Sequence, residues 1–364
     1  MLKYLSRSAL LRPSLSIVLE GDPYQIGLQH GSKLKASITQ VVGILHRLIK
    51  QYDPPREQRL ADHVEKYLPY AKDYAPELVS EIRGIADAAG VSFEEIFALN
   101  SINEVTYSPL TAGCTAFAVP ATCKPNGSTL IGQNQDWWLP FTRHFVVLRI
   151  KSENGHTILM TTPAGFIGYV GLNSKGIGVQ ANGLVSNDTR VGVPVPFVTR
   201  KILQQEKIGE AINCVISPRR ASPQNYIIAD ANGEVYDIET TATDHEVIYI
   251  EDRAYAHANH YTSNRLREKA VRWVEADSTV RANRLGKLLR QVGEKVTIEY
   301  LERALGDHTN YPRSICRHPD PRVPESRWEE NWETSMSMIS DVTNGKSWVA
   351  KGNPCSSIYE EFAV

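Results

Sequence analysis

Several features that would point this chain to a particular class of function are scarce in its sequence. It has only five cysteines, an odd and widely scattered set, which argues against a disulfide framework and favours a reducing compartment. No apolar run approaches the roughly 20 residues needed to cross a bilayer. The formal net charge is −1, so no overall positive charge suggests nucleic acid or an acidic membrane surface as a partner. We therefore expect a globular cytoplasmic protein that acts on small molecules.

Familiar binding motifs are also incomplete. Residues 176–181, GIGVQA, fit the dinucleotide pattern G-x-G-x-x-A, but no helix opens behind them. Residues 344–347 resemble the end of a phosphate-binding loop without its earlier glycine, and no G-x-S-x-G elbow is present. His257 and His260 form an H-x-x-H pair, yet no nearby cysteine or carboxylate set completes a metal site. The sequence therefore predicts neither a metal nor a cofactor.

What the chain does contain differs between its two parts. Residues 22–105 follow helical patterns, beginning with a cap at Asp22-Pro23. One helical face is marked by apolar residues three and four apart, at Leu34, Ile38, Val42, Leu45 and Ile49. A second helix is expected from Pro76 to Gly90, and a capping box at 92–95 starts a third. These faces are most simply explained as core.

From Cys114 onward, short runs of β-branched and aromatic residues alternate with turn residues. Residues 226–239 form a predicted hairpin with Asn232-Gly233 at its turn, and residues 335–352 form another. Helical patterns return near 195–216 and 280–306. This order predicts an α+β layered protein with mainly antiparallel sheet, in which a helical N-terminal part and a sheet-rich part make one structural domain.

The two ends of the sequence bear on the compartment. The first residues carry Lys3, Arg7 and Arg12 with no acid before Glu20, which is compatible with a weak organelle-targeting leader. The alternative, which we favour, is a ragged lead into a first strand at 15–21. The chain ends in Phe-Ala-Val, which is not a peroxisomal tripeptide.

The pair Gly113-Cys114 raises a specific chemical hypothesis. A thiol reacts as its thiolate and needs a base, which most cysteine enzymes supply as histidine. If the chain were cut before Cys114, the new α-amino group, with an ordinary pKa near 8, would be that base. The thiol can make this cut itself by attacking the preceding carbonyl, and glycine at that position tolerates strained backbone. From these residues alone, a buried structural cysteine is the more common explanation.

Seven segments in order along the chain favour the catalytic alternative. They are PYQIGLQHGSKLK (23–35), EIRGIADAAGVS (81–92), GCT (113–115), GQNQDWW (132–138), GYVGLNSKGIGVQANGL (168–184), HANH (257–260) and NYPRSICR (310–317). Together they resemble the acyl-coenzyme A:6-aminopenicillanate acyltransferase (isopenicillin N acyltransferase) family. These are amino-terminal-nucleophile (Ntn) hydrolases related to bile-salt and penicillin V hydrolases. The resemblance implies a four-layer αββα sandwich and a precursor cleaved into an α chain, 1–113, and a β chain, 114–364, that stay associated.

The same resemblance implies roles for individual residues. Cys114 is the nucleophile released by cleavage after Gly113, and Asp136 orients the new amino group. Asn259 is the expected oxyanion donor, and Arg317 neutralises charge near the thiol or binds a substrate carboxylate. Further substrate or oxyanion contacts are implied for the residues Asn182, Thr115 and Ser314.

The expected reaction is the transfer of an acyl group, through a thioester on Cys114, to an amine or to water. A coenzyme A thioester is one candidate acyl donor, alongside β-lactam and linear N-acyl amides, and a small amine is the acceptor. Three alternatives stay open. One is a hydrolase of linear amides or β-lactam side chains without acyltransferase activity. Another is an enzyme centred on Cys316 with a nearby histidine, His308 or His318, as base. The third is an unprocessed, non-enzymatic protein that binds a small ligand.

Overall fold

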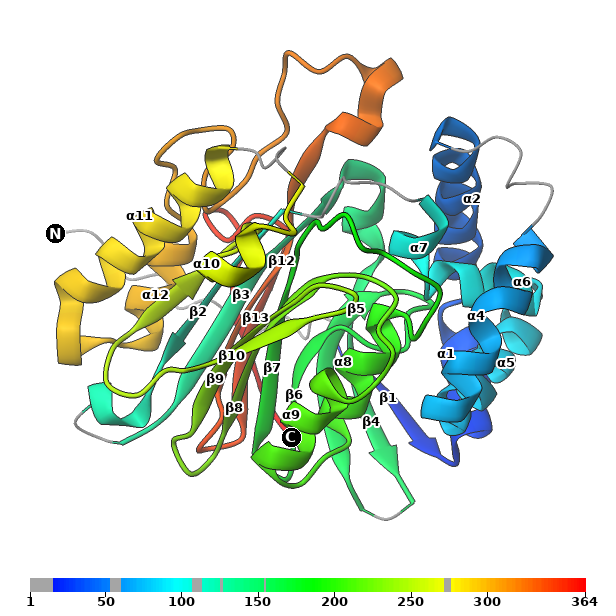
Figure 1. Cartoon of the computed structure of the whole chain (residues 1–364), viewed down its shortest axis with the longest axis horizontal. Helices are drawn as coiled ribbons and strands as arrows, with labels where there is room; N and C mark the ends of the chain where they lie inside the picture. The colour runs from blue at the N-terminus through cyan, green and yellow to red at the C-terminus, as the bar shows by residue number, and fades with distance from the viewer. Residues whose placement is uncertain (1–15, 53–59, 107–112, 125–126, 154, 272–275) are drawn as a thin grey trace, which may run out of the picture.

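The computed structural model describes residues 16–52, 60–106, 113–124, 127–153, 155–271 and 276–364. Residues 1–15, which were weighed as a targeting leader against a ragged lead, and the residues just before Gly113 lie outside this part of the chain. Two β-sheets stack face to face and carry helices on both outer sides (Figure 1). The predicted α+β class, with four αββα layers and mainly antiparallel sheets, is confirmed.

The first sheet has eight strands, and each neighbouring pair is antiparallel except β1 with β4, which is parallel. β1 is the strand expected near residues 15–21. In spatial order the strands are β1 (Ser16–Gly21), β4 (Phe145–Ser152), β5 (Thr157–Pro163), β6 (Val170–Asn173), β7 (Ile177–Gly183), β8 (Gln224–Asp230), β9 (Val235–Thr240) and β10 (His245–Tyr249). The predicted hairpin at 226–239 is the β8–β9 turn, where Gly233 has a φ of 106° that favours glycine.

The second sheet has six strands, all antiparallel to their neighbours. In spatial order they are β11 (Tyr255–His257), β2 (Cys114–Val119), β3 (Leu130–Trp138), β12 (Trp332–Asp341), β13 (Lys346–Lys351) and β14 (Glu360–Ala363). β12 and β13 are the second predicted hairpin. Because β2 and β3 pair directly, Cys114 lies opposite Gln135, one residue before Asp136.

Helices cover the outer face of each sheet. Beside the first sheet lie α1 (Pro23–Lys33), α2 (Lys35–Tyr52), α4 (Leu60–Tyr74), α5 (Pro76–Ala89), α6 (Phe93–Leu99), α7 (Ile102–Thr106), α8 (Val195–Leu203) and α9 (Ile208–Ile216). Against the second sheet lie α11 (Ala276–Val292) and α12 (Ile298–Leu305), and the short α10 (Asn264–Arg267) precedes them. Figure 1 shows α1 to α7 on the right of the molecule and α11 and α12 on the left. Short 3₁₀ turns occupy Ala121–Cys123, Leu139–His144, Gly293–Lys295 and Glu325–Glu330.

The local signals read from the sequence form as predicted. Asp22 caps α1 in a capping box with Gln25, and Ser92 caps α6 in another with Glu95. Gly90 ends α5 in the left-handed conformation. The five residues of the predicted helical face are all buried, at Leu34, Ile38, Val42, Leu45 and Ile49. Apolar periodicity therefore identified the packed face of the N-terminal helices correctly.

The N-terminal helices also hold a loop of the sheet-rich part, residues 164–169. The backbone N–H of Gly165 donates to His30 Nε2 at 3.0 Å, and burial lowers the pKa of His30 to about 3, which keeps the ring neutral as an acceptor. Asn100 exchanges hydrogen bonds with the Gly165 carbonyl and the Ile167 N–H at 2.9 and 2.8 Å. The part of the chain before residue 113 thus fixes a loop that ends at Tyr169.

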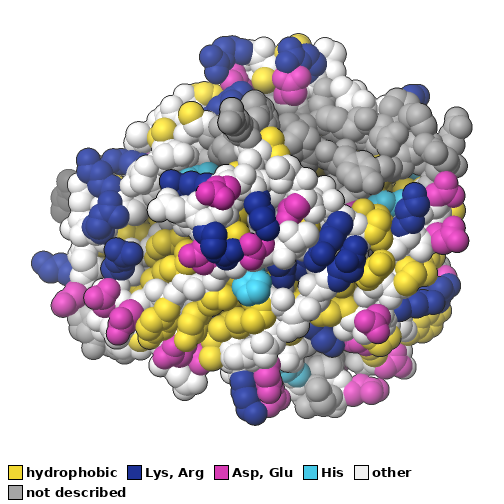
Figure 2. Space-filling model, viewed as in Figure 1, with side chains coloured by type: hydrophobic (Ala, Val, Ile, Leu, Met, Phe, Trp, Pro, Cys, Tyr) yellow, Lys and Arg dark blue, Asp and Glu magenta, His cyan; other side chains and the backbone are white. Residues whose placement is uncertain are grey.

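On the face drawn in Figure 2, basic and acidic side chains are interspersed, so neither sign of charge covers this face alone. This distribution agrees with the formal net charge of −1. Among the described residues, no helix is both long and apolar enough to cross a membrane.

Candidate active site

Cys114 is the first residue of β2 and is almost fully buried, with 1% of its surface exposed. Successive side chains of a strand point to opposite faces of the sheet. Ala116 and Ala118 belong to the cluster between the sheets, whereas Phe117 and Val119 pack with the residues of α11 and α12. Cys114 therefore points between the two sheets, from a rigid position in a central strand.

The thiol has one aromatic hydroxyl beside it. Its Sγ lies 3.4 Å from the hydroxyl of Tyr169, which also accepts a hydrogen bond from Trp137 Nε1 at 3.1 Å. Burial, together with the negative charge of Asp136, raises the pKa of the Cys114 thiol to about 11. A thiol in this environment is protonated at neutral pH, so a nucleophilic role requires a nearby proton acceptor.

Gly113 is enclosed on two sides. Its carbonyl oxygen accepts a hydrogen bond from the Asp136 backbone N–H at 2.7 Å. A Cβ at this position would lie 2.8 Å from Arg317 Nη1 and 2.9 Å from Asp136 Oδ2. The φ of Gly113 is not positive, so glycine is needed here because of space. The strained backbone suggested by the sequence is not observed at this residue.

Asp136 lies fully buried in β3, close to the Gly113-Cys114 bond. Its Oδ1 accepts from the Thr334 hydroxyl at 2.7 Å, while Oδ2 has no hydrogen-bond partner among the described residues. Burial raises the pKa of this carboxyl to about 7, although Arg281 and Arg317 pull it downward. The group can therefore take up or release a proton near neutral pH.

Two arginines and a second carboxylate complete the charged surroundings. Arg317 Nη1 lies 3.3 Å from Asp277 Oδ2, and Arg281 Nε lies 3.0 Å from the same oxygen. Arg281 also donates to the Cys114 carbonyl at 2.6 Å. All three of these charged groups are buried. Asp277 and Arg281 occupy successive turns of α11, so this helix delivers the pair to the start of β2.

Asn259 contacts Cys114 through its amide oxygen. The backbone N–H of Cys114 donates to Asn259 Oδ1 at 2.9 Å, and Arg281 Nη2 donates to the same oxygen at 3.0 Å. Asn259 Nδ2 donates to the Gly183 carbonyl at 3.0 Å. This arrangement places Asn259 beside the nitrogen that cleavage would convert to an amine.

His257 anchors the HANH segment, and its hydrogen-bond partners differ from those of His260. Its two ring nitrogens lie 2.9 Å from Glu239 Oε1 and 2.8 Å from the Ala258 carbonyl oxygen. Burial disfavours the charged ring, but Asp237 and Glu239 outweigh it and raise the pKa of His257. His260 Nδ1 instead meets Ser278 Oγ at 2.8 Å. The H-x-x-H pair thus serves as structural support for Asn259.

The three further contacts predicted from the sequence lie in different places. Asn182 is buried in β7, and both polar atoms of its side chain lack a hydrogen-bond partner in the described structure. Its strand neighbour Gly178 faces Ile131 of the other sheet, so by alternation Asn182 points between the sheets, as Cys114 does. Thr115 points the opposite way and accepts from Arg281 at 2.8 Å. Ser314 donates to the Cys316 carbonyl at 2.6 Å. The structure therefore directs Asn182, but neither hydroxyl, toward the side of the thiol.

Cys316, the alternative nucleophile, does lie near a histidine. Its Sγ is 3.5 Å from His318 Nε2, and burial raises the pKa of its thiol to about 12. A cavity suited to a small molecule opens elsewhere, however, and its lining includes Tyr169 but not Cys316. The cavity thus adjoins Tyr169, a contact of Cys114, although neither thiol is in its lining.

The cavity measures about 230 Å³ and is mainly apolar. Its apolar wall includes the side chains Trp137, Phe166, Leu184, Val195, Pro196 and Val271. Tyr169 and Gly183 also line it, and these two residues contact Cys114 and Asn259 respectively. Glu104 lies in the wall, where burial raises its pKa to about 7. Cys114 is not itself in the lining, so the cavity is an apolar space with one carboxyl group that adjoins two residues in contact with Cys114 and Asn259.

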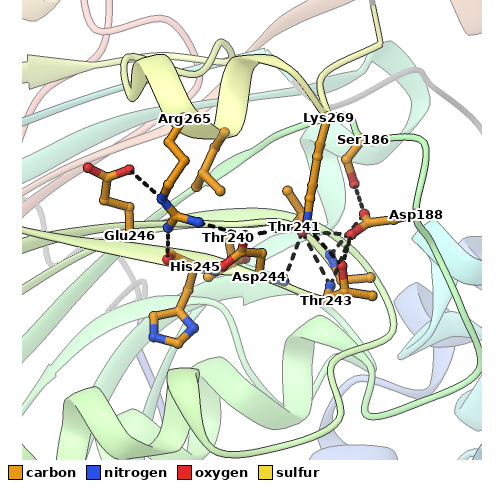
Figure 3. Close-up of polar contacts among 12 residues, drawn as sticks. Ser186, Asp188, Thr240, Thr241, Thr243, Asp244, His245, Glu246, Arg265 and Lys269 are labelled. Carbon is orange, nitrogen blue, oxygen red and sulfur yellow. Dashed lines mark hydrogen bonds and ion pairs between the residues drawn. The ribbon is translucent and has the colours of Figure 1, made fainter.

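One wall of the cavity, residues 184–189, is held by the polar network drawn in Figure 3. Asp188 accepts from Ser186 Oγ at 2.5 Å and from Thr241 Oγ1 at 2.7 Å, and it is also hydrogen-bonded to Thr243. These bonds lower the pKa of Asp188 to about 2 against the effect of burial. The carboxylate stays charged at working pH and ties the wall to the turn between β9 and β10.

Sequence reasoning missed three residues of this site, namely Tyr169, Asp277 and Arg281. A signal for Arg281 existed, because Leu285 and Leu289 follow it at intervals of four and are buried on the same helix. A charged residue in an apolar stripe indicates a buried partner. Tyr169 stands in a quoted segment, but nothing in its spacing indicated a contact with Cys114.

Comparison with known proteins yields a family and several relatives. A sequence model of the family described as acyl-coenzyme A:6-aminopenicillanic acid acyl-transferase matches residues 122–355. That span contains Asp136, Asn182, Asn259 and Arg317 but begins after Cys114. The 40 kDa form of acyl-coenzyme A:6-aminopenicillanic-acid-acyltransferase from Emericella nidulans is 29% identical over 349 residues, which cover 93% of each chain. An uncharacterized protein from Archaeoglobus fulgidus is 26% identical over 59% of this chain and 41% of its own.

Solved structures give weaker similarities. The Caenorhabditis elegans orthologue of N-acylethanolamine-hydrolyzing acid amidase is 15% identical and has a TM-score of 0.44, over 63% of this chain and 93% of its own. A variant of conjugated bile acid hydrolase from Clostridium perfringens is 11% identical with a TM-score of 0.45, over 69% and 97% respectively.

Proposed function

The chain belongs to the acyl-coenzyme A:6-aminopenicillanic acid acyl-transferase family, and from that premise we propose that it is a self-processing enzyme that transfers acyl groups through Cys114. At the coarser level it is an enzyme of acyl transfer or amide hydrolysis. The observation that carries the finer proposal is the enclosure of the Gly113-Cys114 bond by Asp136, Arg281 and Arg317.

The proposed first step is cleavage of the chain by its own thiol. Cys114 Sγ attacks the Gly113 carbonyl carbon, and the negative charge develops on the Gly113 oxygen. The Asp136 backbone N–H, 2.7 Å away, is placed to stabilise that charge. The C–N bond then breaks, which leaves a thioester between Gly113 and Cys114. Water hydrolyses the thioester, so that Gly113 gains a carboxylate and Cys114 a free thiol and a free amine.

Asp136 is the proposed proton carrier for this step. Its carboxylate accepts the thiol proton and returns it to the departing nitrogen of Cys114, so the proton balance closes without another group. A pKa of about 7 suits both halves of the transfer. The buried Oδ2 without a hydrogen-bond partner supports the assignment, because leaving a buried acceptor unpaired costs about 1–3 kcal/mol. The freed amine would supply the missing donor.

In the proposed turnover, the Cys114 amine takes the proton of the thiol. The thiolate attacks an acyl carbonyl held in the cavity, and the acyl group passes to sulfur as the leaving group departs with the proton. A water or an amine then attacks the thioester and restores the thiol. Asn182 Nδ2 has no hydrogen-bond partner in the described structure, and Asn259 lies against Cys114, so the side-chain amides of these two residues are the proposed oxyanion donors.

The cavity supports an acyl donor with an apolar acyl group. Burying such a group against Phe166, Leu184 and Val195 contributes about 25 cal/mol for each Å² of apolar surface removed from water. Both hydrolysis and transfer follow from one thioester, and the outcome depends on whether an amine competes with water. We propose no resident cofactor for the acyl transfer itself, and a coenzyme A thioester enters only as a candidate donor.

The decisive test is the covalent state of purified protein, measured by intact mass and amino-terminal sequencing. Processing predicts fragments 1–113 and 114–364, the larger beginning Cys-Thr-Ala-Phe, and a Cys114→Ala chain that stays whole. We expect the fragments to remain associated on gel filtration, because the 164–169 loop is bonded to His30 and Asn100 of the smaller one. An intact wild-type chain after long incubation would contradict the proposal and favour the ligand-binding alternative.

A second assay separates the remaining alternatives. Acyl-coenzyme A, a β-lactam amide and a linear N-acyl amide are each supplied with and without a small amine, and the products are identified by their molecular mass. New amide indicates transfer, and free acid alone indicates hydrolysis. Activity that survives Cys114→Ala and disappears in Cys316→Ala would favour the enzyme centred on Cys316.

A further inference from the structure

Four side chains outside the active site converge on one point. They are His308 and His318, Cys316, and Cys355 from the loop that follows β13. Their ligand atoms, two imidazole nitrogens and two sulfurs, all lie within 4.8 Å of one another. His318 Nε2 is 3.1 Å from His308 Nε2, 3.5 Å from Cys316 Sγ and 3.4 Å from Cys355 Sγ.

Hydrogen bonding alone does not account for this arrangement. A neutral imidazole nitrogen carries either one hydrogen or one lone pair, so His318 Nε2 satisfies at most one of its three neighbours. Protonation of both rings would bring two positive charges to 3.1 Å. A cation at the centre, with a bond from each of the four atoms, removes this conflict.

We propose that His308, Cys316, His318 and Cys355 bind one zinc ion. Zinc in proteins is tetrahedral, with bonds of about 2.0–2.1 Å to nitrogen and about 2.3 Å to sulfur. The edges of that tetrahedron are about 3.3–3.4 Å between nitrogens and about 3.6 Å between nitrogen and sulfur. The observed separations of 3.1, 3.4 and 3.5 Å are within a few tenths of these edges.

The set of donors also matches zinc chemically. Two thiolates neutralise the ion, and two neutral imidazoles complete four protein ligands, which is the composition of a closed structural site. Asn353 Nδ2 lies 3.9 Å from Cys316 Sγ and offers it a weak hydrogen bond. Cys355 and His308 are exposed, so an ion can enter from solvent.

The sequence did not reveal this site for two reasons. The H-x-x-H pattern drew attention to His257 and His260 only. The spacing Cys316-x-His318 is also shorter than the spacing of the usual zinc ligand pairs. Cys355 follows His318 by 37 positions and reaches it only because β12 and β13 return the chain to the same place.

Arg317 lies in the sequence between two of the proposed ligands, Cys316 and His318, so the bound ion would also restrain Arg317. The ion would join the 308–318 loop to the loop after β13 and so hold the backbone on both sides of Arg317. Arg317 Nη1 is the atom 2.8 Å from where a Gly113 Cβ would be. Zinc binding itself is independent of the proposed function, and only its effect on the cleavage rate rests on it.

The first experiment measures metal directly. Full-length protein, purified with reductant and dialysed against zinc and then against metal-free buffer, is expected to keep one zinc per chain. Cobalt in its place is expected to give the intense visible bands of a tetrahedral site and a thiolate-to-cobalt charge-transfer band. Cys355→Ser and His308→Ala, both at exposed positions, are expected to lose stoichiometric metal and these bands. Cys123→Ser is the matched control and is expected to keep them.

The second experiment measures the effect on the fold and on cleavage. Zinc is expected to raise the thermal unfolding midpoint of the wild-type chain and of Cys123→Ser but not of Cys355→Ser. Cleavage is expected to slow in Cys355→Ser. If no variant and no wild-type chain is cleaved, that result contradicts the proposed function but leaves the zinc proposal standing. The zinc proposal is overturned if the wild-type chain keeps no metal, if Cys355→Ser keeps it, or if mass analysis finds Cys316 and Cys355 joined as a disulfide.

Discussion

Replacing Arg281 by methionine tests the part of the site that only the structure revealed. Arg281 donates to Asp277, to the Cys114 carbonyl, to Thr115 and to Asn259 at distances of 2.6 to 3.0 Å. Methionine fills similar space but donates nothing. The change leaves Asp277 with one arginine fewer and removes the charge-assisted bond to the Cys114 carbonyl.

The expected size follows from these contacts. Removing one partner of a buried ion pair costs about 3–5 kcal/mol of stability. A hydrogen bond to a charged group is worth about 1.5–3 kcal/mol. If only the bond to the Cys114 carbonyl contributes to the barrier, cleavage slows about 10- to 150-fold, since about 1.4 kcal/mol corresponds to a factor of ten.

The assay follows the loss of full-length chain by gel electrophoresis and mass, together with thermal unfolding. Arg284→Met is the matched control, because Arg284 lies on the same helix and pairs with Asp307 at 2.6 Å nearer the surface. This control is expected to lose at most about 1 kcal/mol and to process normally. Arg281→Lys keeps the charge without the planar fork, so it is expected to fold and to cleave slowly even if the methionine variant does not fold. Cleavage of a folded Arg281→Lys or Arg281→Met chain at the wild-type rate would refute the reasoning.

Four further predictions address the bond itself and the reacting centre. Gly113→Ala is expected to fold but to remain uncleaved for hours, because its methyl would meet Arg317 and Asp136 closer than 3.0 Å; a normal cleavage rate on gels would contradict this. The cleavage rate is expected to rise about tenfold per pH unit up to pH about 7 and then level off, because the base Asp136 is protonated below its raised pKa; a flat profile would exclude this base. In the uncleavable Cys114→Ala chain, the raised pKa of Asp136 means that the folded state binds a proton more tightly than the unfolded state. Stability measured by denaturant is therefore expected to fall as the pH rises from about 4 to 7. Asp136→Asn is expected to make this slope shallower, while Glu104, whose pKa is also raised to about 7, keeps its own contribution. Asn182→Ala is expected to lower kcat about 100- to 1,000-fold with an intact cleavage step, and unchanged turnover would remove it from the oxyanion site.

Much of the fold was predictable from local patterns. The spacing of Leu34, Ile38 and Val42 identified a buried helical face, and the Asn-Gly turn at 232–233 identified a hairpin. These signals depend on neighbouring residues only, because helix and strand periodicity follow from backbone geometry. The pairing of β1 with β4 in parallel carries no such signal, since it joins residues more than a hundred positions apart.

The candidate site likewise contains residues that local sequence identified and residues that only the structure revealed. The segments that contain Cys114, Asp136, Asn259 and Arg317 were recognisable because each has a characteristic local sequence. Arg281 and Asp277 lie on an ordinary amphipathic helix, and Tyr169 follows glycines in a loop. Their importance comes from partners in other segments, and no local sequence records such a partner.

The sequence by itself determined which bond is the candidate for cleavage and which residue types surround it. Only the tertiary structure decided why glycine is required at 113, since the limit is the space between Arg317 and Asp136 and not the backbone conformation. It also brought Cys355 to His308, Cys316 and His318, which strand pairing joins across the chain. The physical reason is the same in both cases. Distances between residues far apart in the chain are set by packing of the two sheets and their helices, and these distances fix which atoms share a charge, a proton or a metal ion.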